Sequence, residues 1–248
     1  MARQKLGQHF LTSRPVLERI ARAACAPDEP LVIEIGAGQG ALTEQLLARA
    51  RRVVAVEIDT SMIDHLRHRF GNEPRLQIVH GDALEVDFAQ WAPAPVTGNL
   101  PYYVATPILE RMARIGGVFL IQKEVAERVT ARPGSRAYGY LTVLLALFAD
   151  SEILFTVKPG AFRPPPKVDS AVIRLHPHGR ASQLGITDVR GFLEFVSACF
   201  RQKRKTLRNN LMEWNLEAVP ELKMRAEQLT LEQFAELYRR LTASKQAE

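Results

Sequence analysis

The residues best suited to chemistry lie at positions 99–103, where the chain has the run Asn99-Leu100-Pro101-Tyr102-Tyr103. The apolar stretch before them predicts the end of a buried strand. Pro101 has no N–H to donate, so strand pairing is predicted to stop there. Ligands of open α/β sheets bind at the carboxyl ends of strands. An amide, a carbonyl and an aromatic ring at that edge suit a flat base with an exocyclic amine; the structural alternative is a turn with a packed tyrosine pair.

Other predicted strand ends carry groups suited to a nucleoside. A glycine loop with Gly36, Gly38 and Gly40 follows one strand and lets a ligand approach the backbone closely. Glu57 ends the next strand, where its carboxylate can accept from ribose hydroxyls. Asp82 follows a third strand and can accept from an adenine amine. Together these features predict a cofactor that contains adenosine.

The glycine spacing bears on which cofactor this is. A dinucleotide fingerprint has the spacing G-x-G-x-x-G, whereas this chain has G-x-G-x-G at positions 36–40. The tighter loop, with Asp82 after the third strand, favours S-adenosylmethionine. A nicotinamide-dependent oxidoreductase remains the alternative from another enzyme class.

The elements that would position these residues alternate between strand and helix patterns, which indicates an α/β fold. Ser13 is expected to cap a first helix, preceded by the apolar pair Phe10 and Leu11, which would anchor the basic N-terminal arm. Strands are predicted at residues 31–35, 52–57, 76–79, 95–98, 117–121, 153–157 and 168–175.

A proline-rich segment at residues 158–167 includes three consecutive prolines, which favour an extended backbone. Phe162 lies beside them and could stack on one face of a base whose other face meets Tyr102. The alternative is that Phe162 fills the core.

Length and composition limit the remaining possibilities. The 248 residues are 46% hydrophobic and 24% charged, as in ordinary globular proteins. No apolar run is long enough for a membrane span, and no export signal is apparent. Cys25 and Cys199 suggest reduced thiols in a cytoplasmic protein. The histidines lack a third ligand, so no metal site is predicted. The net charge of +6 favours a polyanionic partner.

A polar stretch near residues 176–185 predicts a domain boundary, so residues 1–180 would form the cofactor domain and residues 181–248 a helical RNA-binding domain. A continuous helix is expected through residues 192–211. Five bases without an intervening acid would form a phosphate-binding face on it, against the alternative of a merely solvated face. These bases are Arg201, Lys203, Arg204, Lys205 and Arg208.

The chain resembles class I methyltransferases, and more specifically the small-subunit ribosomal RNA adenine dimethyltransferases of the kasugamycin-resistance type. The similar segments run nearly from end to end and lie at residues 7–11, 34–38, 81–83, 99–102, 122–125, 162–172 and 204–211. The related large-subunit resistance methylases share the motif at 99–102 but match the last segment poorly. The resemblance implies a Rossmann-like fold with a seven-stranded, mostly parallel sheet and a small all-helical C-terminal domain.

The resemblance also implies roles for individual residues. His9 and Leu11 would lie along the methionine end of S-adenosylmethionine, with Gly36 beneath it. Asn99 would contact both the methyl donor and the target, and Leu100 would supply its carbonyl.

The implied activity is dimethylation of two adjacent adenines in a loop near the 3′ end of small-subunit ribosomal RNA, in ribosome biogenesis. The implied partner is the small ribosomal subunit, and a cytoplasmic monomer is expected. An RNA-binding assembly factor without activity is the non-enzymatic alternative. Residues 210–225 form a shorter segment than this family leads one to expect.

Overall fold

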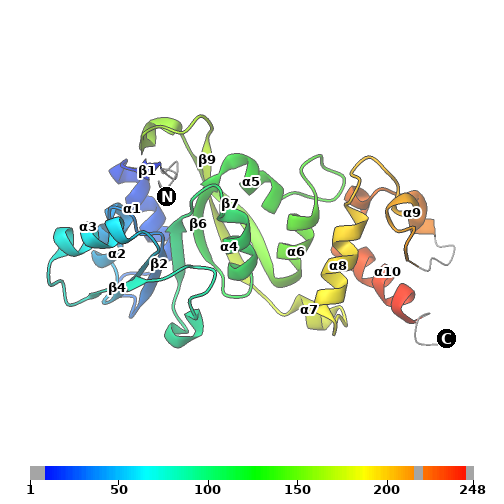
Figure 1. Ribbon diagram of the computed structural model, residues 1–248, viewed down its shortest axis with the longest axis horizontal. Coiled ribbons are helices and arrows are strands. Elements are labelled where there is room, and N and C mark those ends of the chain that lie inside the picture. Colours follow the sequence, from blue (N-terminus) through cyan, green and yellow to red (C-terminus); the bar gives the residue numbers. More distant parts are fainter. Residues whose placement is uncertain (1–8, 215–219, 244–248) are drawn as a thin grey trace, which may run out of the picture. The chain divides into compact units, whose positions relative to one another are not determined.

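The computed structural model describes residues 9–214 and 220–243 (Figure 1). The predicted arm residues Arg3 and Lys5 lie outside these ranges. The chain divides into two compact units. Unit 1 contains Met1–Ala126 and Glu152–His176, and unit 2 contains Glu127–Ser151 and Pro177–Glu248.

Seven strands of the described chain form one sheet in the order β4-β3-β2-β5-β6-β9-β7. Their bounds are β2 Val32–Ile35, β3 Val53–Glu57, β4 Leu76–His80, β5 Val96–Asn99, β6 Gly117–Gln122, β7 Ala149–Val157 and β9 Ser170–Pro177. The pairs from β4 to β6 are parallel, and β9 runs antiparallel to β6. The predicted mostly parallel sheet is therefore confirmed. The strand order reverses between β2 and β5, which is where such sheets bind ligands.

The central strands are nearly continuous apolar runs because both of their faces are covered. Every residue of β2 and β3 is buried. Helices α1 (Arg14–Ala24) and α2 (Ala41–Leu47) pack on each other, and their leucines and isoleucine share one core with Val32, Val53 and Val118 of the sheet. Figure 1 shows the two helices close to β2. This core fixes the strand ends that carry the predicted site.

The remaining helices of this part of the chain connect the strands in order. They are α3 Thr60–Phe70, the 3-10 helix η1 Phe88–Trp91, α4 Ala105–Met112 and α5 Lys123–Val129. Ser13 occupies the N-cap position of α1, but its side chain makes no capping hydrogen bond, so the expected cap is not formed. Pro15 lies in the first turn instead, where a missing N–H costs nothing.

A second, two-stranded sheet ties the N-terminal segment to unit 1. β1 (Phe10–Leu11) pairs antiparallel with β8 (Phe162–Arg163), with Leu11 opposite Phe162. The backbone N–H of Thr12 also donates to the Ala161 carbonyl at 2.8 Å. The predicted anchoring by Phe10 and Leu11 is confirmed, and the proline-rich segment supplies the strand that receives it.

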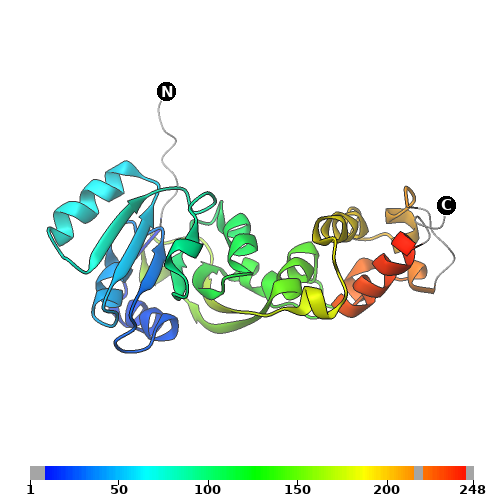
Figure 2. The ribbon, with the colours of Figure 1, turned by 90° about the horizontal axis from the view of Figure 1, so that it is seen from below.

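Unit 2 is built from helices that pack mainly on α8. Its α-helices are α6 Tyr140–Phe148, α7 Arg180–Gln183, α8 Val189–Cys199, α9 Leu207–Asn210 and α10 Leu231–Ala243, and the short 3-10 helices η3 Pro220–Lys223 and η4 Ala226–Gln228 precede α10. Helices α6 and α10 both contact α8, and Figure 2 shows the gold, orange and red segments that contain α8, α9 and α10. Residues 127–151, which were assigned to the first domain, group with this unit. The functional boundary at residues 180/181 stays a prediction.

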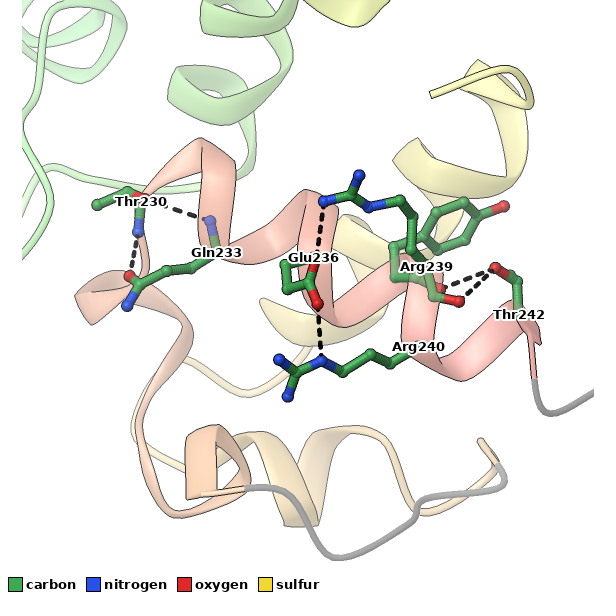
Figure 3. A network of polar contacts seen from close by, with 7 residues as sticks. Thr230, Gln233, Glu236, Arg239, Arg240 and Thr242 are labelled. Atoms are coloured by element: carbon green, nitrogen blue, oxygen red, sulfur yellow. Dashed lines mark hydrogen bonds and ion pairs between the residues drawn. The ribbon is translucent and has the colours of Figure 1, made fainter. Parts of the chain in front are cut away.

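Helix α10 satisfies its polar groups locally (Figure 3). Thr230 and Gln233 exchange side-chain hydrogen bonds with each other's backbone N–H groups at its first turn. Glu236 pairs with Arg239 at 2.6 Å and with Arg240 at 2.8 Å. The cations of this helix are therefore matched by an acid.

The expected continuous helix through residues 192–211 is wrong. α8 ends at Cys199 and α9 begins at Leu207, so residues 200–206 form a turn that carries most of the predicted basic face. The buried Asn210 explains the break, because its amide donates to the carbonyls of Cys199 and Gln202 and its oxygen accepts from the Gln202 N–H. Side-chain hydrogen bonds of this kind offer the backbone an alternative to the helix.

Two expectations concern what the fold lacks. No helix in the described ranges is long and apolar enough to cross a membrane. Among the same residues, no group of three histidine, cysteine or acidic side chains is placed to hold a metal ion.

Candidate functional site

A cavity of about 620 Å³ opens at the carboxyl ends of β2, β3, β4 and β5. It is lined by all of the predicted cofactor residues and by three of the four predicted catalytic ones, with Asn99 belonging to both sets. These are His9, Leu11, Gly36, Glu57, Asp82, Asn99, Leu100 and Tyr102. Tertiary folding thus brings together residues up to 93 positions apart, because parallel strands end at one edge of the sheet.

The glycine loop after β2 is joined directly to Glu57. Gly36 and Gly38 have φ values of +70° and +52°, a region that favours glycine. The N–H of Gly38 donates to Glu57 Oε2 at 2.8 Å, and the N–H groups of Ile58 and Asp59 donate to Oε1 at 3.0 Å. A carboxylate offers about four acceptor positions, so this buried group retains about one for a further donor, on Oε2.

Asp82 lies in a loop that another side chain holds in place. Its Oδ1 accepts from the Leu84 N–H at 2.8 Å, and no described residue donates to Oδ2. Arg111 of α4 donates to the carbonyls of Ala83 and Val86 in the same loop. The position of Asp82 is therefore fixed while one of its oxygens remains available to a ligand.

Asn99 ends β5 at the switch point of the sheet. Gly98 before it lies so close to β2 that a Cβ there would come within 2.3 Å of the Ile35 carbonyl, so only glycine allows this pairing. The Asn99 amide nitrogen donates to the His9 carbonyl at 3.3 Å. That bond turns the nitrogen towards the N-terminal segment and leaves the side-chain oxygen as an acceptor. The Leu100 N–H donates to Leu120, which fixes the following turn.

Tyr102 is held in place by a hydrogen bond and a ring contact. Its hydroxyl forms a 2.8 Å hydrogen bond with Ser170, and its ring centroid lies 5.6 Å from that of His9. His9 in turn donates from Nδ1 to the Pro164 carbonyl at 2.8 Å. Burial raises the pKa of Tyr102, so the hydroxyl stays protonated near neutral pH. The arrangement presents an ordered aromatic surface beside the Asn99 amide.

Phe162 is the exception among the predicted catalytic residues. It is fully buried in the core with Leu11, Leu17 and Val172 and does not line the cavity. It pairs opposite Leu11 and packs in the same core cluster, whereas Leu11 also reaches the cavity. The expectation that Phe162 faces the cavity beside Tyr102 is not met in this structure, and the core alternative describes its position.

Glu34 and Tyr103 are among the cavity residues to which the sequence reasoning assigned no role. Glu34 lies in the middle of β2, fully buried, and burial raises its pKa to about 7; its Oε2 accepts from the Thr43 hydroxyl at 2.5 Å. An acid within the apolar run of residues 31–35 is a visible pattern that could have drawn attention. Tyr103 also lines the cavity, and its only indication was its place next to Tyr102.

The predicted basic residues belong to unit 2 and are not among the residues that line this cavity. Residues 201–205 and Arg208 are exposed. Lys203 donates from Nζ to the Arg136 carbonyl at 2.5 Å, which joins the turn to the basic loop at residues 133–139. Arg201 pairs with Glu213 at 3.4 Å. Arg204, Lys205 and Arg208 form no ion pair with a described residue.

Comparison with known proteins gives matches over nearly the whole chain. A family model described as ribosomal RNA adenine dimethylase matches residues 1–243. The protein named ribosomal RNA small subunit methyltransferase A from Xanthomonas campestris pv. campestris (strain 8004) is 45% identical over 218 residues, which cover 85% of this chain and 83% of that protein. The protein of the same name from Acidobacterium capsulatum is 42% identical and covers 96% of this chain and 90% of its own length.

Solved structures show the same fold over the same extent. A dimethyladenosine transferase from Plasmodium falciparum is similar with a TM-score of 0.76 and 26% identity, covering 96% of this chain and 98% of that one. The 23S rRNA methyltransferase ErmE is similar with a TM-score of 0.67, also at 26% identity, covering 94% and 99%. Both similarities extend beyond the sheet to the helical C-terminal part.

Proposed function

The chain belongs to the ribosomal RNA adenine dimethylase family, and we propose that it methylates two adjacent adenines near the 3′ end of small-subunit ribosomal RNA. Each exocyclic amine would receive two methyl groups from S-adenosylmethionine, as a step in ribosome biogenesis. Family membership removes the nicotinamide-dependent oxidoreductase from consideration. The choice of small-subunit RNA is supported by the names of relatives at 42% and 45% identity.

The observation that carries the proposal is the placement of Asn99 at the cavity, with its amide nitrogen already committed to His9. The side-chain oxygen is left as an acceptor for an amine hydrogen. The Leu100 carbonyl would accept the second hydrogen. Two acceptors suit the exocyclic amine of adenine, which carries two hydrogens.

The chemical difficulty is that the adenine amine is a poor nucleophile, because its lone pair is delocalised into the ring. Methyl transfer requires the nitrogen to become more tetrahedral. Acceptors at its hydrogens favour that geometry and stabilise the positive charge that develops on nitrogen, so they bind the transition state better than the planar ground state. No strong general base is required, since the methylated nitrogen is acidic and loses its proton readily.

The residues present fit S-adenosylmethionine, which when bound supplies an electrophilic methyl group. Glu57 would hold one ribose hydroxyl through its remaining acceptor position on Oε2, which is fewer than the two hydroxyls expected from sequence. Asp82 would accept from the adenine amine through Oδ2. Gly36, His9 and Leu11 would line the remaining part of the cofactor.

Tyr102 would stack on the target adenine after the base leaves its helix, a contact worth roughly 1–3 kcal/mol. The exposed bases of unit 2 would contact RNA phosphates, which adds affinity without reading sequence. We expect a cytoplasmic monomer that takes the small subunit or its precursor as substrate.

Labelled methyl transfer tests the proposal. Small subunits that lack the modification should accept up to four methyl groups per particle, two on each of two neighbouring adenines, when incubated with the protein and S-adenosylmethionine. Mapping of the modified bases should place them near the 3′ end. Preferential methylation of large-subunit RNA would replace the substrate assignment, and binding to small subunits without methyl transfer would favour an assembly factor.

A further inference from the structure

The described residues include seven large apolar side chains that are exposed to solvent, and these are unevenly distributed between the cavity and the rest of the surface. They are Ile58, Leu84, Tyr103, Ile115, Ile153, Val168 and Met212. The first three line the cavity, whereas the other four do not. Each of the three follows the end of a different strand. Each also lies within two positions of a residue that the proposed function assigns to the cofactor or the reaction, namely Glu57, Asp82 or Tyr102. Exposed apolar groups that gather at a cavity indicate a ligand with an apolar face.

Tyr103 is the most exposed of the three, at 59%. Partial burial raises the pKa of its phenol, with smaller contributions from the negative charges of Glu57, Asp82 and Asp59. Glu57 and Asp82 line the same cavity as Tyr103. The phenol remains a neutral hydrogen-bond donor near neutral pH.

Tyr102 has a different environment, although it is the adjacent residue. Its hydroxyl is bonded to Ser170 and its ring lies near His9, on the side of the N-terminal segment. Two neighbouring tyrosines therefore have different surroundings. The proposed function assigns Tyr102 to the target base, whereas Tyr103 shares the cavity with the carboxylates that would bind adenosine.

We propose that Tyr103 is a further cofactor-binding residue, whose ring packs on the adenosine part of S-adenosylmethionine together with Ile58 and Leu84. This inference rests on the proposed function and deepens it. The ring is exposed to water until a ligand covers it, so cofactor binding buries apolar area that the free protein leaves in solvent. The contact is to adenosine, so S-adenosylhomocysteine benefits from it as much as the methyl donor does.

Calorimetry with S-adenosylhomocysteine tests the inference on the full chain. Tyr103→Ala should raise the dissociation constant by about 5- to 50-fold, since stacking on a base has effects of this size. Tyr103→Phe keeps the ring and should stay within about threefold of wild type. Val168→Ala is the matched control, because Val168 is an exposed apolar residue of the same unit outside the cavity, and it should bind as wild type.

Kinetics separate this role from a structural one. Tyr103→Ala should raise KM for S-adenosylmethionine while kcat at saturating cofactor changes little, and affinity for small-subunit RNA should be unchanged. A Tyr103→Trp variant should show a fluorescence change on adding S-adenosylhomocysteine that wild type lacks.

Glu57→Ala distinguishes failure of the inference from failure of the cofactor site. Weak binding in Glu57→Ala but wild-type binding in Tyr103→Ala would overturn only the role of Tyr103. Wild-type binding in both would overturn the cofactor assignment as well. Loss of RNA affinity in Tyr103→Ala, with cofactor affinity intact, would move Tyr103 to the target base and also overturn the inference.

Discussion

The cavity edge in unit 1 and the basic turn in unit 2 use polar groups in opposite ways. At the edge, Glu57 is buried and receives three backbone hydrogen bonds, while Asn99 is oriented by the His9 carbonyl. In the turn, Arg204 and Lys205 are exposed and form no ion pair with a described residue. The cavity edge holds individual acceptor atoms in place, whereas the turn presents exposed positive charges to the solvent.

The difference corresponds to two kinds of recognition. Buried acceptors that are held by backbone donors discriminate strongly between ligands, because a ligand that lacks the matching donor leaves these acceptors unpaired. Exposed cations contact phosphates additively and carry no sequence information. We therefore expect substitutions at the edge to have large, specific effects, and substitutions in the turn to have smaller effects that depend on salt.

The largest effect is expected from Asn99→Ala. Single-turnover methyl transfer should fall by about 100-fold or more, since removal of a group that stabilises transition-state charge has effects of this size. Affinities for cofactor and RNA should change by less than about threefold by the same reasoning. Rapid-quench measurements would check the rate, and a near-normal rate would remove Asn99 from the mechanism.

Glu57→Ala should weaken S-adenosylmethionine binding by about 1–3 kcal/mol, because it removes an acceptor and leaves three backbone N–H groups without their partner. Asp82→Ala should weaken S-adenosylmethionine binding less, since Asp82 is only half-buried and accepts one backbone hydrogen bond. Titration calorimetry on both variants would measure the difference. Equal losses would mean that the backbone network around Glu57 does not contribute.

Reversal of Arg204, Lys205 and Arg208 to Glu should lower RNA affinity and reduce its dependence on salt, by about two units in the slope of log affinity against log salt. Cofactor affinity should be unchanged. The matched control reverses Arg190, Arg239 and Arg240, which are paired with acids and change the net charge equally. Equal slopes for the two variants would mean that the turn is a solvated surface that does not bind RNA phosphates.

The buried acid Glu34 should make stability depend on pH. Burial raises its pKa to about 7 from 4.5, so the folded protein binds this proton more tightly than the unfolded chain does. Stability is then lost as the pH rises from about 4.5 to about 7. The free energy of unfolding of Glu34→Gln should exceed that of wild type by about 3 kcal/mol at pH 8 and should equal it near pH 4. Denaturant titrations of both proteins across this pH range would measure the difference in unfolding free energy. A difference that does not change with pH would contradict the titration of Glu34 as its cause.

Asn210→Ala should have the smallest effect on binding. It removes the three hydrogen bonds that shape the basic turn without removing a cation, so RNA affinity should fall about threefold with little change in the salt slope. The free energy of unfolding should fall by about 1–3 kcal/mol as well, because buried backbone groups lose their partner. Measuring RNA affinity against salt and unfolding in parallel would show both effects.

Much of the sheet could be predicted from sequence because each buried parallel strand is a short apolar run followed by a residue that ends it. The strands at β2, β3, β4 and β5 and the polar residues after them were placed correctly within one or two positions. The family follows from residues that lie close together in the chain, such as those at 99–102 and 204–211. These are local patterns, which a sequence displays directly.

Contacts between distant segments were decided only by the tertiary structure. Apolar periodicity alone extended one helix through residues 200–206, whereas the Asn210 amide hydrogen-bonds to carbonyls up to 11 positions away and ends it. A phenylalanine at position 162 could either stack on a base or pack in the core. Its pairing with Leu11, 151 positions earlier in the chain, places it in the core. The donors that occupy Glu57 were likewise invisible, because a carboxylate's free acceptors depend on which backbone groups the fold brings to it.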